Sequence, residues 1–256
     1  MLKAILFDIS GVLHVDNIPV PGAVELIKKL QKKRIPLRFV TNTSRSTSTA
    51  ILLNLQKMGF DVKPEDIFTA PVAVKHVCRQ RQLRPFCLIH PDLKPEFNEL
   101  NQRNPNAVIV ADAAERFDYK HLNRAFSILM TGAPLLGIGR NRYFKSADTL
   151  QLDAGPFIQA LEYAADIEAE ILGKPAAGFF NAAISSLGLE PDQVLMIGDD
   201  VEADVLGAID AGLHACLVRT GKFLPKDEQK LGSAKVADNV ADAVGQYFEI
   251  ADHIQA

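Results

Sequence analysis

Side chains suited to binding magnesium and phosphate follow several short apolar segments of this sequence. They are Asp8 and Ser10, Thr41 and Asn42, Lys174, and, within the stretch GDDVEAD, Asp199, Asp200 and Asp204. Carboxylate oxygens are the hard ligands that octahedral Mg²⁺ prefers, and a substrate phosphate can complete its coordination. A cation and a hydroxyl nearby could neutralise the phosphate oxygens. The residue types therefore indicate a site for Mg²⁺ and a small phosphorylated molecule.

The same carboxylates could also perform covalent catalysis. An Asp that attacks phosphorus divides hydrolysis into the formation and the breakdown of an aspartyl phosphate. In a doubly wound sheet, ligands bind beyond the carboxyl ends of the strands, where residues directly after an apolar segment meet. The positions of these side chains therefore favour phosphoryl chemistry at such an edge.

Each of these features has an ordinary structural explanation when it stands alone. An Asp after a strand is commonly a turn residue, and Thr41 with Asn42 could simply cap a helix. A Gly-Lys-Pro sequence often only begins a helix, and the acidic residues after Gly198 suit the positive end of a helix dipole. Four such features, in this order at four element boundaries, favour a functional site.

The apolar pattern alternates between strands and helices at both ends of the chain. The predicted strands are 3–7, 36–41, 194–198 and 215–219, and the predicted helices are 23–33, 46–58, one after Pro175 and one that ends before Gly212. This rhythm is typical of an α/β protein with a doubly wound parallel sheet.

The middle of the chain interrupts this rhythm. Its strand candidates at 86–90, 107–111 and 134–139 and its helix candidate at 119–130 are separated by Pro and Gly turns. We interpret residues 73–167 as an inserted α/β domain, and residues 1–72 and 168–256 as a Rossmann-like core that contains the predicted site.

Four motifs, FDISGVL, FVTNTSR, GKP and MIGDDVEAD, resemble in type and order those of the haloacid dehalogenase (HAD) superfamily. The spacing between the second and third motifs resembles subfamily IIA, which has a large C2-type α/β cap inserted there. The D-x-S-G start and the stretches GRNRYFK, GPFIQALEYA and VRTGKF resemble more closely the phosphatases of phospholysine, phosphohistidine and pyrophosphate in this family. The resemblance implies a Mg²⁺-dependent phosphatase with a HAD-like core and a cap.

The resemblance also assigns roles to the residues of the first two motifs. It implies that Asp8 is the nucleophile and a Mg²⁺ ligand, and that Ser10 offers its backbone carbonyl to the metal. Thr41 and Asn42 match the second motif, which binds the phosphate.

The third and fourth motifs complete the implied site. Lys174 would pair with the phosphate and with the nucleophile, and Asp199 would be a further metal ligand. Either Asp200 or Asp204 would support the metal site, and the sequence does not rank these two residues.

Ser10 departs from the family pattern, in which most phosphatases carry a second Asp at this position. A serine hydroxyl cannot protonate a poor leaving group or activate water as a carboxylate does, and such acid–base catalysis contributes about 10²–10⁴-fold. We therefore expect slow turnover of ordinary sugar phosphates and better turnover of pyrophosphate, phosphoramidates and activated esters. The alternative is a catalytically weak protein that binds or scaffolds a phosphorylated ligand.

Composition bounds the partners and the location. The net charge of −3 and the absence of a long basic run give no attraction to nucleic acid or to an anionic membrane. The three cysteines have neither metal-site nor disulfide spacing, so we expect a reducing, cytoplasmic location. No apolar stretch approaches the ~20 residues of a membrane span. A homodimer would be compatible with a cap whose sheet edge needs cover.

Two further groups of polar residues have no assigned role. His14 lies in the loop after Asp8 and could contact substrate, although a lone loop histidine is more often only exposed to solvent. Arg140, Asn141 and Arg142 could line the cap side of the cleft, although a charged turn is the default explanation.

Overall fold

The computed structural model of the chain describes residues 1–146, 149–232 and 234–248. Its contacts divide the chain into two compact units. Unit 1 consists of Met1–Thr41, Leu52–Ile67 and Ala183–Ala256, and unit 2 consists of Asn42–Ile51 and Phe68–Ala182. The predicted cap, residues 73–167, falls within unit 2, and its boundaries stay a prediction.

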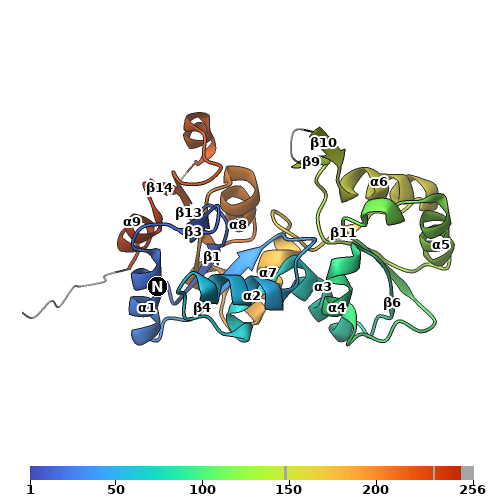
Figure 1. Cartoon of the computed structure of the whole chain (residues 1–256), viewed down its shortest axis with the longest axis horizontal. Coiled ribbons are helices and arrows are strands. Elements are labelled where there is room, and N and C mark those ends of the chain that lie inside the picture. Colours follow the sequence, from blue (N-terminus) through green and yellow to red (C-terminus); the bar gives the residue numbers. More distant parts are fainter. Residues whose placement is uncertain (147–148, 233, 249–256) are drawn as a thin grey trace, which may run out of the picture. The chain divides into compact units, whose positions relative to one another are not determined.

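A six-stranded sheet has the order β14-β13-β12-β1-β4-β5 (Figure 1). Its strands are β1 Ala4–Asp8, β4 Leu37–Thr41, β5 Ile67–Thr69, β12 Val194–Gly198, β13 His214–Val218 and β14 Lys235–Ala237. β1 pairs in parallel with both β4 and β12, so the chain order changes direction between β1 and β12. Asp8 ends β1 and Asp199 directly follows β12, which places both acidic residues at this switch point.

The central strand of this sheet is buried on both faces. All five residues of β1 are buried, and Phe7 stacks on Phe39 of β4 with a centroid distance of 6.0 Å. Strands covered on both faces need continuous rather than alternating apolar residues, which explains the run AILF before Asp8.

Helices alternate with these strands, as the sequence predicts. They are α1 Ala23–Lys32, α2 Ser48–Lys57, α7 Ala177–Ser185, α8 Gly207–Asp210 and α9 Val240–Gly245. The helix expected before Gly212 begins with a π-helical turn, η5 Val201–Leu206, an element that is frequent at functional sites. In the described part of the chain, no helix is both long and apolar enough to cross a membrane.

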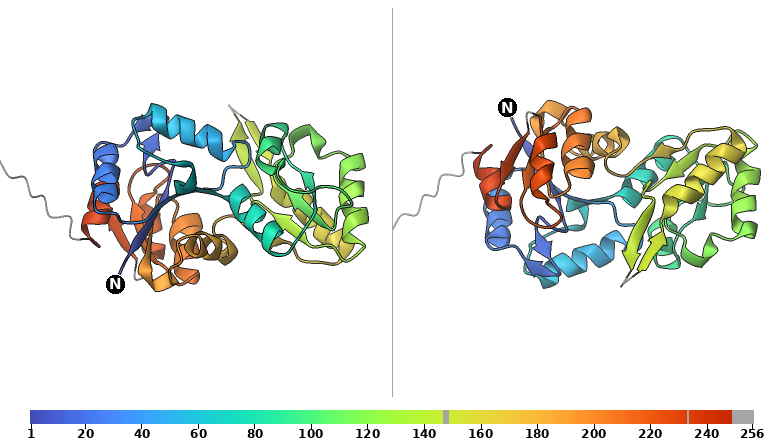
Figure 2. Two further views of the ribbon diagram at one scale, coloured as in Figure 1. Left: turned by 90° about the horizontal axis from the view of Figure 1, so that it is seen from below. Right: turned by 90° about the horizontal axis from the view of Figure 1, so that it is seen from above.

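Unit 2 contains a second parallel sheet, with the order β11-β8-β7-β6. The strands are β6 Pro85–Leu88, β7 Ala107–Val110, β8 Leu135–Gly137 and β11 Glu170–Ile171. Helices α5 Tyr119–Leu129 and α6 Ala154–Ala165 pack on one face of this sheet (Figure 2). Their buried side chains share one hydrophobic core with Phe86, Val108 and Leu135 of the strands.

Two helices and a hairpin of unit 2 are among the elements that the sequence did not predict. They are α3 Ala70–Gln80, α6, and the hairpin of β9 Tyr143–Ser146 with β10 Thr149–Leu152. Both helices have N-cap residues that could have revealed them, because Thr69 accepts the Val72 N–H and Asp153 accepts the Ala154 N–H.

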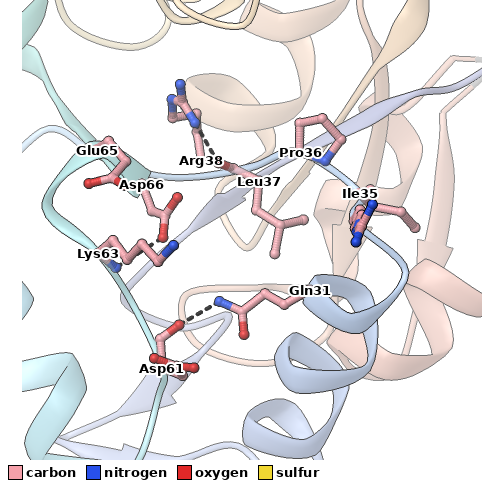
Figure 3. Close-up of a pocket in the computed structure, with 10 residues that line it drawn as sticks. Gln31, Ile35, Pro36, Leu37, Arg38, Asp61, Lys63, Glu65 and Asp66 are labelled. Carbon is pink, nitrogen blue, oxygen red and sulfur yellow. Dashed lines mark hydrogen bonds between the residues drawn. The ribbon is translucent and has the colours of Figure 1, made fainter.

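A cavity of about 350 Å³ lies at the amino end of β4 in unit 1 (Figure 3). Three cationic and three acidic residues line it, namely Arg34, Arg38, Lys63, Asp61, Glu65 and Asp66. Ligands of doubly wound sheets bind at the carboxyl ends of the strands, which is the opposite end of β4. The balanced charges and this position set the cavity apart from the predicted site.

Candidate active site

Three buried carboxylates gather at the carboxyl edge of the unit 1 sheet. Asp8, Asp199 and Asp204 are 7%, 1% and 1% exposed, and each offers an oxygen within 4.8 Å of the others. Asp8 reaches this point from β1, Asp199 from the end of β12, and Asp204 from the π-helical turn η5. Burying like charges together is costly unless a cation neutralises them. The arrangement is therefore one that could hold a metal ion.

Close backbone approach holds Asp199 in this cluster. Its Oδ2 accepts the Lys222 N–H at 2.7 Å. A Cβ atom at Gly11 would lie 2.0 Å from Asp199 Oδ2, and one at Gly221 would lie 2.1 Å from the same atom. Both glycines have positive φ, 89° and 63°, so glycine is required there for conformation as well as for space. The sequence prediction missed Gly221 and Lys222 as parts of the site, although the stretch VRTGKF contains them.

The structure separates the two acidic residues that the sequence did not rank. Asp204 lies in the carboxylate cluster, and its Oδ2 accepts the Asp200 N–H at 3.2 Å. The Asp200 side chain instead caps the π-helical turn, because its Oδ1 accepts the N–H groups of Glu202 and Ala203 at 3.1 and 3.0 Å. Asp204 is therefore the residue placed to hold a cation, and Asp200 is placed to hold the turn.

Asn42 and Lys174 lie together in unit 2. The Asn42 side chain accepts the Lys174 N–H through Oδ1 and donates to the Lys174 carbonyl through Nδ2, both at 2.7 Å. These two bonds use the carbonyl of the amide and one of its N–H groups. Gly173 fits tightly beside them, since a Cβ there would lie 2.0 Å from the Ile138 carbonyl oxygen and 3.1 Å from Asn42 Oδ1. The geometry makes Asn42 a residue that positions the buried Lys174.

The remaining predicted residues occupy the loops beyond the strands. Thr41 ends β4 and is half-buried, while the Ser10 side chain is exposed. Ser10 forms an isolated parallel β-bridge with His14, and the Gly11 N–H donates to the His14 carbonyl at 2.7 Å. The His14 ring is 8% exposed, and burial lowers its pKa while Asp16 opposes this effect. His14 is therefore buried at the start of the short strand β2 (His14–Val15), directly after the turn that follows Asp8, unlike the exposed loop histidine that its sequence position suggested.

Arg140 also has a structural role in unit 2. Its guanidinium binds Glu162 in a fork, with N–O distances of 3.0 and 2.7 Å. The charged turn that the sequence left open is thus attached to α6 through Arg140.

The carboxylate cluster fits a hard divalent cation. All three side chains offer oxygen, the donor that Mg²⁺ prefers, and Mg²⁺ commonly uses only a few protein carboxylates and keeps several waters. The Lys222 N–H, which donates to Asp199 Oδ2, orients this carboxylate, and Gly11 and Gly221 leave space for it. Asp8, Asp199 and Asp204 are therefore the residues that would hold Mg²⁺.

Known proteins share both the sequence and the fold described above. The sequence model of haloacid dehalogenase-like hydrolases matches residues 5–103, and a second, HAD-hydrolase-like, model matches residues 171–243. A bovine (Bos taurus) protein called haloacid dehalogenase-like hydrolase domain-containing protein 2 is 43% identical over 233 residues, which cover 91% of this chain and 90% of the relative.

The chain belongs to the haloacid dehalogenase-like hydrolases. The human phospholysine phosphohistidine inorganic pyrophosphate phosphatase is 39% identical over 259 residues and covers 98% of this chain and 96% of its own length. A 4-nitrophenylphosphatase from Thermotoga maritima has the same fold, with a TM-score of 0.83, 23% identity, and coverage of 95% and 97% of the two chains.

These findings confirm the predicted superfamily and the α/β fold with a doubly wound sheet. They confirm that the chain is an enzyme of the HAD type and support its assignment as a phosphatase. The two matched segments contain all four predicted motifs, and the stretch between them lies in unit 2.

Proposed function

We propose that the chain is a Mg²⁺-dependent phosphohydrolase that acts through an aspartyl phosphate on Asp8. The observation that carries this proposal is the convergence of three buried carboxylates at the switch point of a parallel sheet. A cluster of this kind is expensive to fold, so a purely structural explanation would need a cation beside it. A phosphatase needs both a metal-binding carboxylate and a nucleophilic one at this edge.

In the proposed first step, a carboxylate oxygen of Asp8 attacks phosphorus. The Asp8 O–P bond forms as the bond from phosphorus to the leaving group breaks, and the leaving group departs with the electron pair. Water then attacks the phosphorus of the aspartyl phosphate, which releases inorganic phosphate and a proton and restores the Asp8 carboxylate. A bound Mg²⁺ would supply charge neutralisation of the phosphate oxygens.

Lys174 of unit 2 supplies the proposed cation for the phosphate, and Asn42 positions it. We assign the third-motif role to Lys174, whose ammonium would neutralise the equatorial phosphate oxygens. Asn42 would position Lys174 through their paired hydrogen bonds rather than bind the phosphate alone. Thr41, at the end of β4, would add a hydroxyl donor.

Ser10 supports a substrate class with good leaving groups. Its hydroxyl cannot donate a proton to an alkoxide at neutral pH, so esters of simple alcohols need help that this residue does not provide. The leaving groups of pyrophosphate, of phosphoramidates protonated on nitrogen and of aryl phosphates depart with less help. The name of the human relative, which includes phospholysine, phosphohistidine and pyrophosphate, supports the same class. We propose a small phosphorylated substrate of this kind, no nucleic-acid or membrane partner, and a cytoplasmic location.

The second candidate function is binding of a phosphorylated ligand with negligible turnover. Ser10 in place of the second acidic residue favours it. A rapid-quench single-turnover experiment with ³²P-labelled pyrophosphate and Mg²⁺ separates the two functions. The enzyme should release labelled phosphate and show acid-stable label on Asp8. Binding without release or label on Asp8 would favour the second function.

Measuring activity with and without Mg²⁺ tests the proposed metal requirement. Hydrolysis of 4-nitrophenyl phosphate should fall to background after EDTA treatment and return when Mg²⁺ is added. Full activity in EDTA would contradict the metal part of the proposal while leaving the nucleophile to be tested separately.

A further inference from the structure

Unit 2 contains a second cavity whose charge is unbalanced. It has a volume of about 240 Å³ and lies at β6, the edge strand of the four-stranded sheet. Three cationic residues line it, Lys94, Arg116 and Arg124. Among the described residues, no Asp or Glu lines this cavity. The cavity in unit 1 differs, because its three cations are matched by three carboxylates.

The two arginines are held in place by neutral partners. Arg124, on α5, lies over the ring of Phe86 with 4.7 Å between its Cζ and the ring centroid. Arg116 donates from Nη1 to the Ile89 carbonyl oxygen at 3.2 Å. Neither partner has a formal charge, so both guanidiniums are oriented and keep their positive charge. Within the described ranges, no ion pair neutralises either arginine or Lys94.

The third cation comes from a separate segment. Lys94 is exposed and begins α4 (Lys94–Phe97), whose Phe97 is fully buried and also lines the cavity. The cavity is therefore lined by two phenylalanines and by positive groups from α4, from the turn that contains Arg116, and from α5. A concave, positively charged surface with low-dielectric walls concentrates anions.

We propose that this cavity binds a compact polyanion. Arg side chains form paired hydrogen bonds with phosphate and carboxylate oxygens, and an ammonium adds a point charge. A volume below the range of about 300–1,000 Å³ that is usual for drug-sized ligands favours a diphosphate or a small tricarboxylate over a nucleotide. This proposal does not depend on Asp8 chemistry, because none of the predicted catalytic or metal-binding residues lines the cavity.

Isothermal titration of the full-length protein with Mg²⁺ tests this proposal. The probes are methylenediphosphonate, whose P–C–P link resists hydrolysis, and citrate, at ionic strength held constant with NaCl. The test variants are Arg116→Gln combined with Arg124→Gln, and the single charge reversal Lys94→Glu. The matched control is Arg103→Gln combined with Lys120→Gln, which removes two exposed cations of unit 2 that do not line the cavity.

We expect the unmodified protein to have one class of binding sites, and we expect its affinity for the probe to fall about tenfold or more in both test variants. The control pair should keep this class, because a general loss of positive charge does not remove oriented donors. If the test variants weaken only the binding of methylenediphosphonate, the site takes a phosphate ligand. If they weaken only the binding of citrate, it takes a carboxylate ligand. Weaker binding of both probes indicates a general polyanion site.

Two results would overturn the proposal. One is the absence of any saturable class that the test variants weaken, and the other is equal weakening in the control pair. Lys94→Glu keeps the test valid if the arginine pair fails to fold, because the Lys94 side chain is exposed and makes no hydrogen bond or ion pair among the described residues.

Discussion

Both parallel sheets place a buried Asp just beyond a strand, yet the two acidic residues have different surroundings. In unit 1, Asp8 ends β1 and lies with two other carboxylates. In unit 2, Asp112 follows β7 and forms an ion pair with Arg45, while its Oδ1 accepts the Ala114 N–H at 3.0 Å. Asp112 therefore pairs with an arginine, whereas Asp8 lies in a group of three carboxylates that could hold a metal ion. An acidic residue after a strand becomes a metal-site candidate when other carboxylates converge on it.

The largest effect that tests this comparison is the loss of catalysis in Asp8→Asn. An amide cannot attack phosphorus, so we expect 4-nitrophenyl phosphate turnover with Mg²⁺ to fall by about 10³-fold or more. Asp112→Asn is the matched control, because it makes the same chemical change after a strand of the other sheet, and its turnover should stay within about tenfold. Similar losses in both variants, with both proteins folded by circular dichroism, would contradict the distinction.

The next largest effect concerns the acid–base function that Ser10 lacks. Ser10→Asp should raise turnover of glycerol phosphate by about 10²-fold and that of pyrophosphate much less, because only the alkoxide needs a proton. Ser10→Asn is a control of similar size that cannot exchange a proton at neutral pH. Steady-state kcat/KM for both substrates measures the difference, and equal gains on both would refute the leaving-group explanation.

A smaller effect should appear in the stability of Asp112→Asn. The substitution removes the ion pair between Asp112 and Arg45, whose side chain is 44% exposed and can be solvated. We expect the free energy of unfolding to fall by about 1–2 kcal/mol. Urea denaturation of Asp112→Asn, of Arg45→Gln and of the double variant measures the coupling. If the loss of unfolding free energy in the double variant equals the sum of the losses in the two single variants, the ion pair contributes nothing to stability.

A further effect, which appears only at alkaline pH, is common to both sheets and involves buried thiols. Burial raises the pKa of Cys87 in β6 and of Cys216 in β13 to about 12. Unfolded thiols ionise near pH 9, so the unfolded state loses protons first and the free energy of unfolding falls as pH rises from about 9 toward 12. Each thiol contributes at most about 1.4 kcal/mol per pH unit.

Urea titrations between pH 8 and 10.5 measure this dependence. Cys87→Ala and Cys216→Ala should each reduce the slope of unfolding free energy against pH, whatever their loss of stability at pH 8. Tyr247, whose pKa burial raises to about 12, adds a further decline that both variants retain. Slopes identical to that of the unmodified protein would show that the thiols do not titrate as described.

The two sheets also differ in how much of each the sequence predicted. Local apolar patterns predict strands β1, β4, β12 and β13 of one sheet, strands β6, β7 and β8 of the other, and helices α1, α2 and α5, which the structure has within about three residues of the predicted bounds. The short strands β5, β14 and β11 were not predicted. α6 was not predicted, because the Gly-Pro pair at its start is typical of a turn and obscured the apolar pattern. Its apolar side chains are recognisable as one buried face only where α5 and the sheet pack against them. Local patterns indicate where an element lies more readily than which surface it covers.

The sequence by itself determined the order of the motifs, the strand ends that bear Asp8 and Asp199, and the family. The tertiary structure decided that Asp204 joins the carboxylate cluster while Asp200 caps a turn. It also decided that the Asn42 side-chain amide forms hydrogen bonds with the Lys174 backbone. It further decided that Lys94 lines one cavity with Arg116 and Arg124. The physical reason is that strand formation depends on neighbours in sequence, whereas the charge around a side chain depends on sheet order, turn geometry and the segments that pack against it.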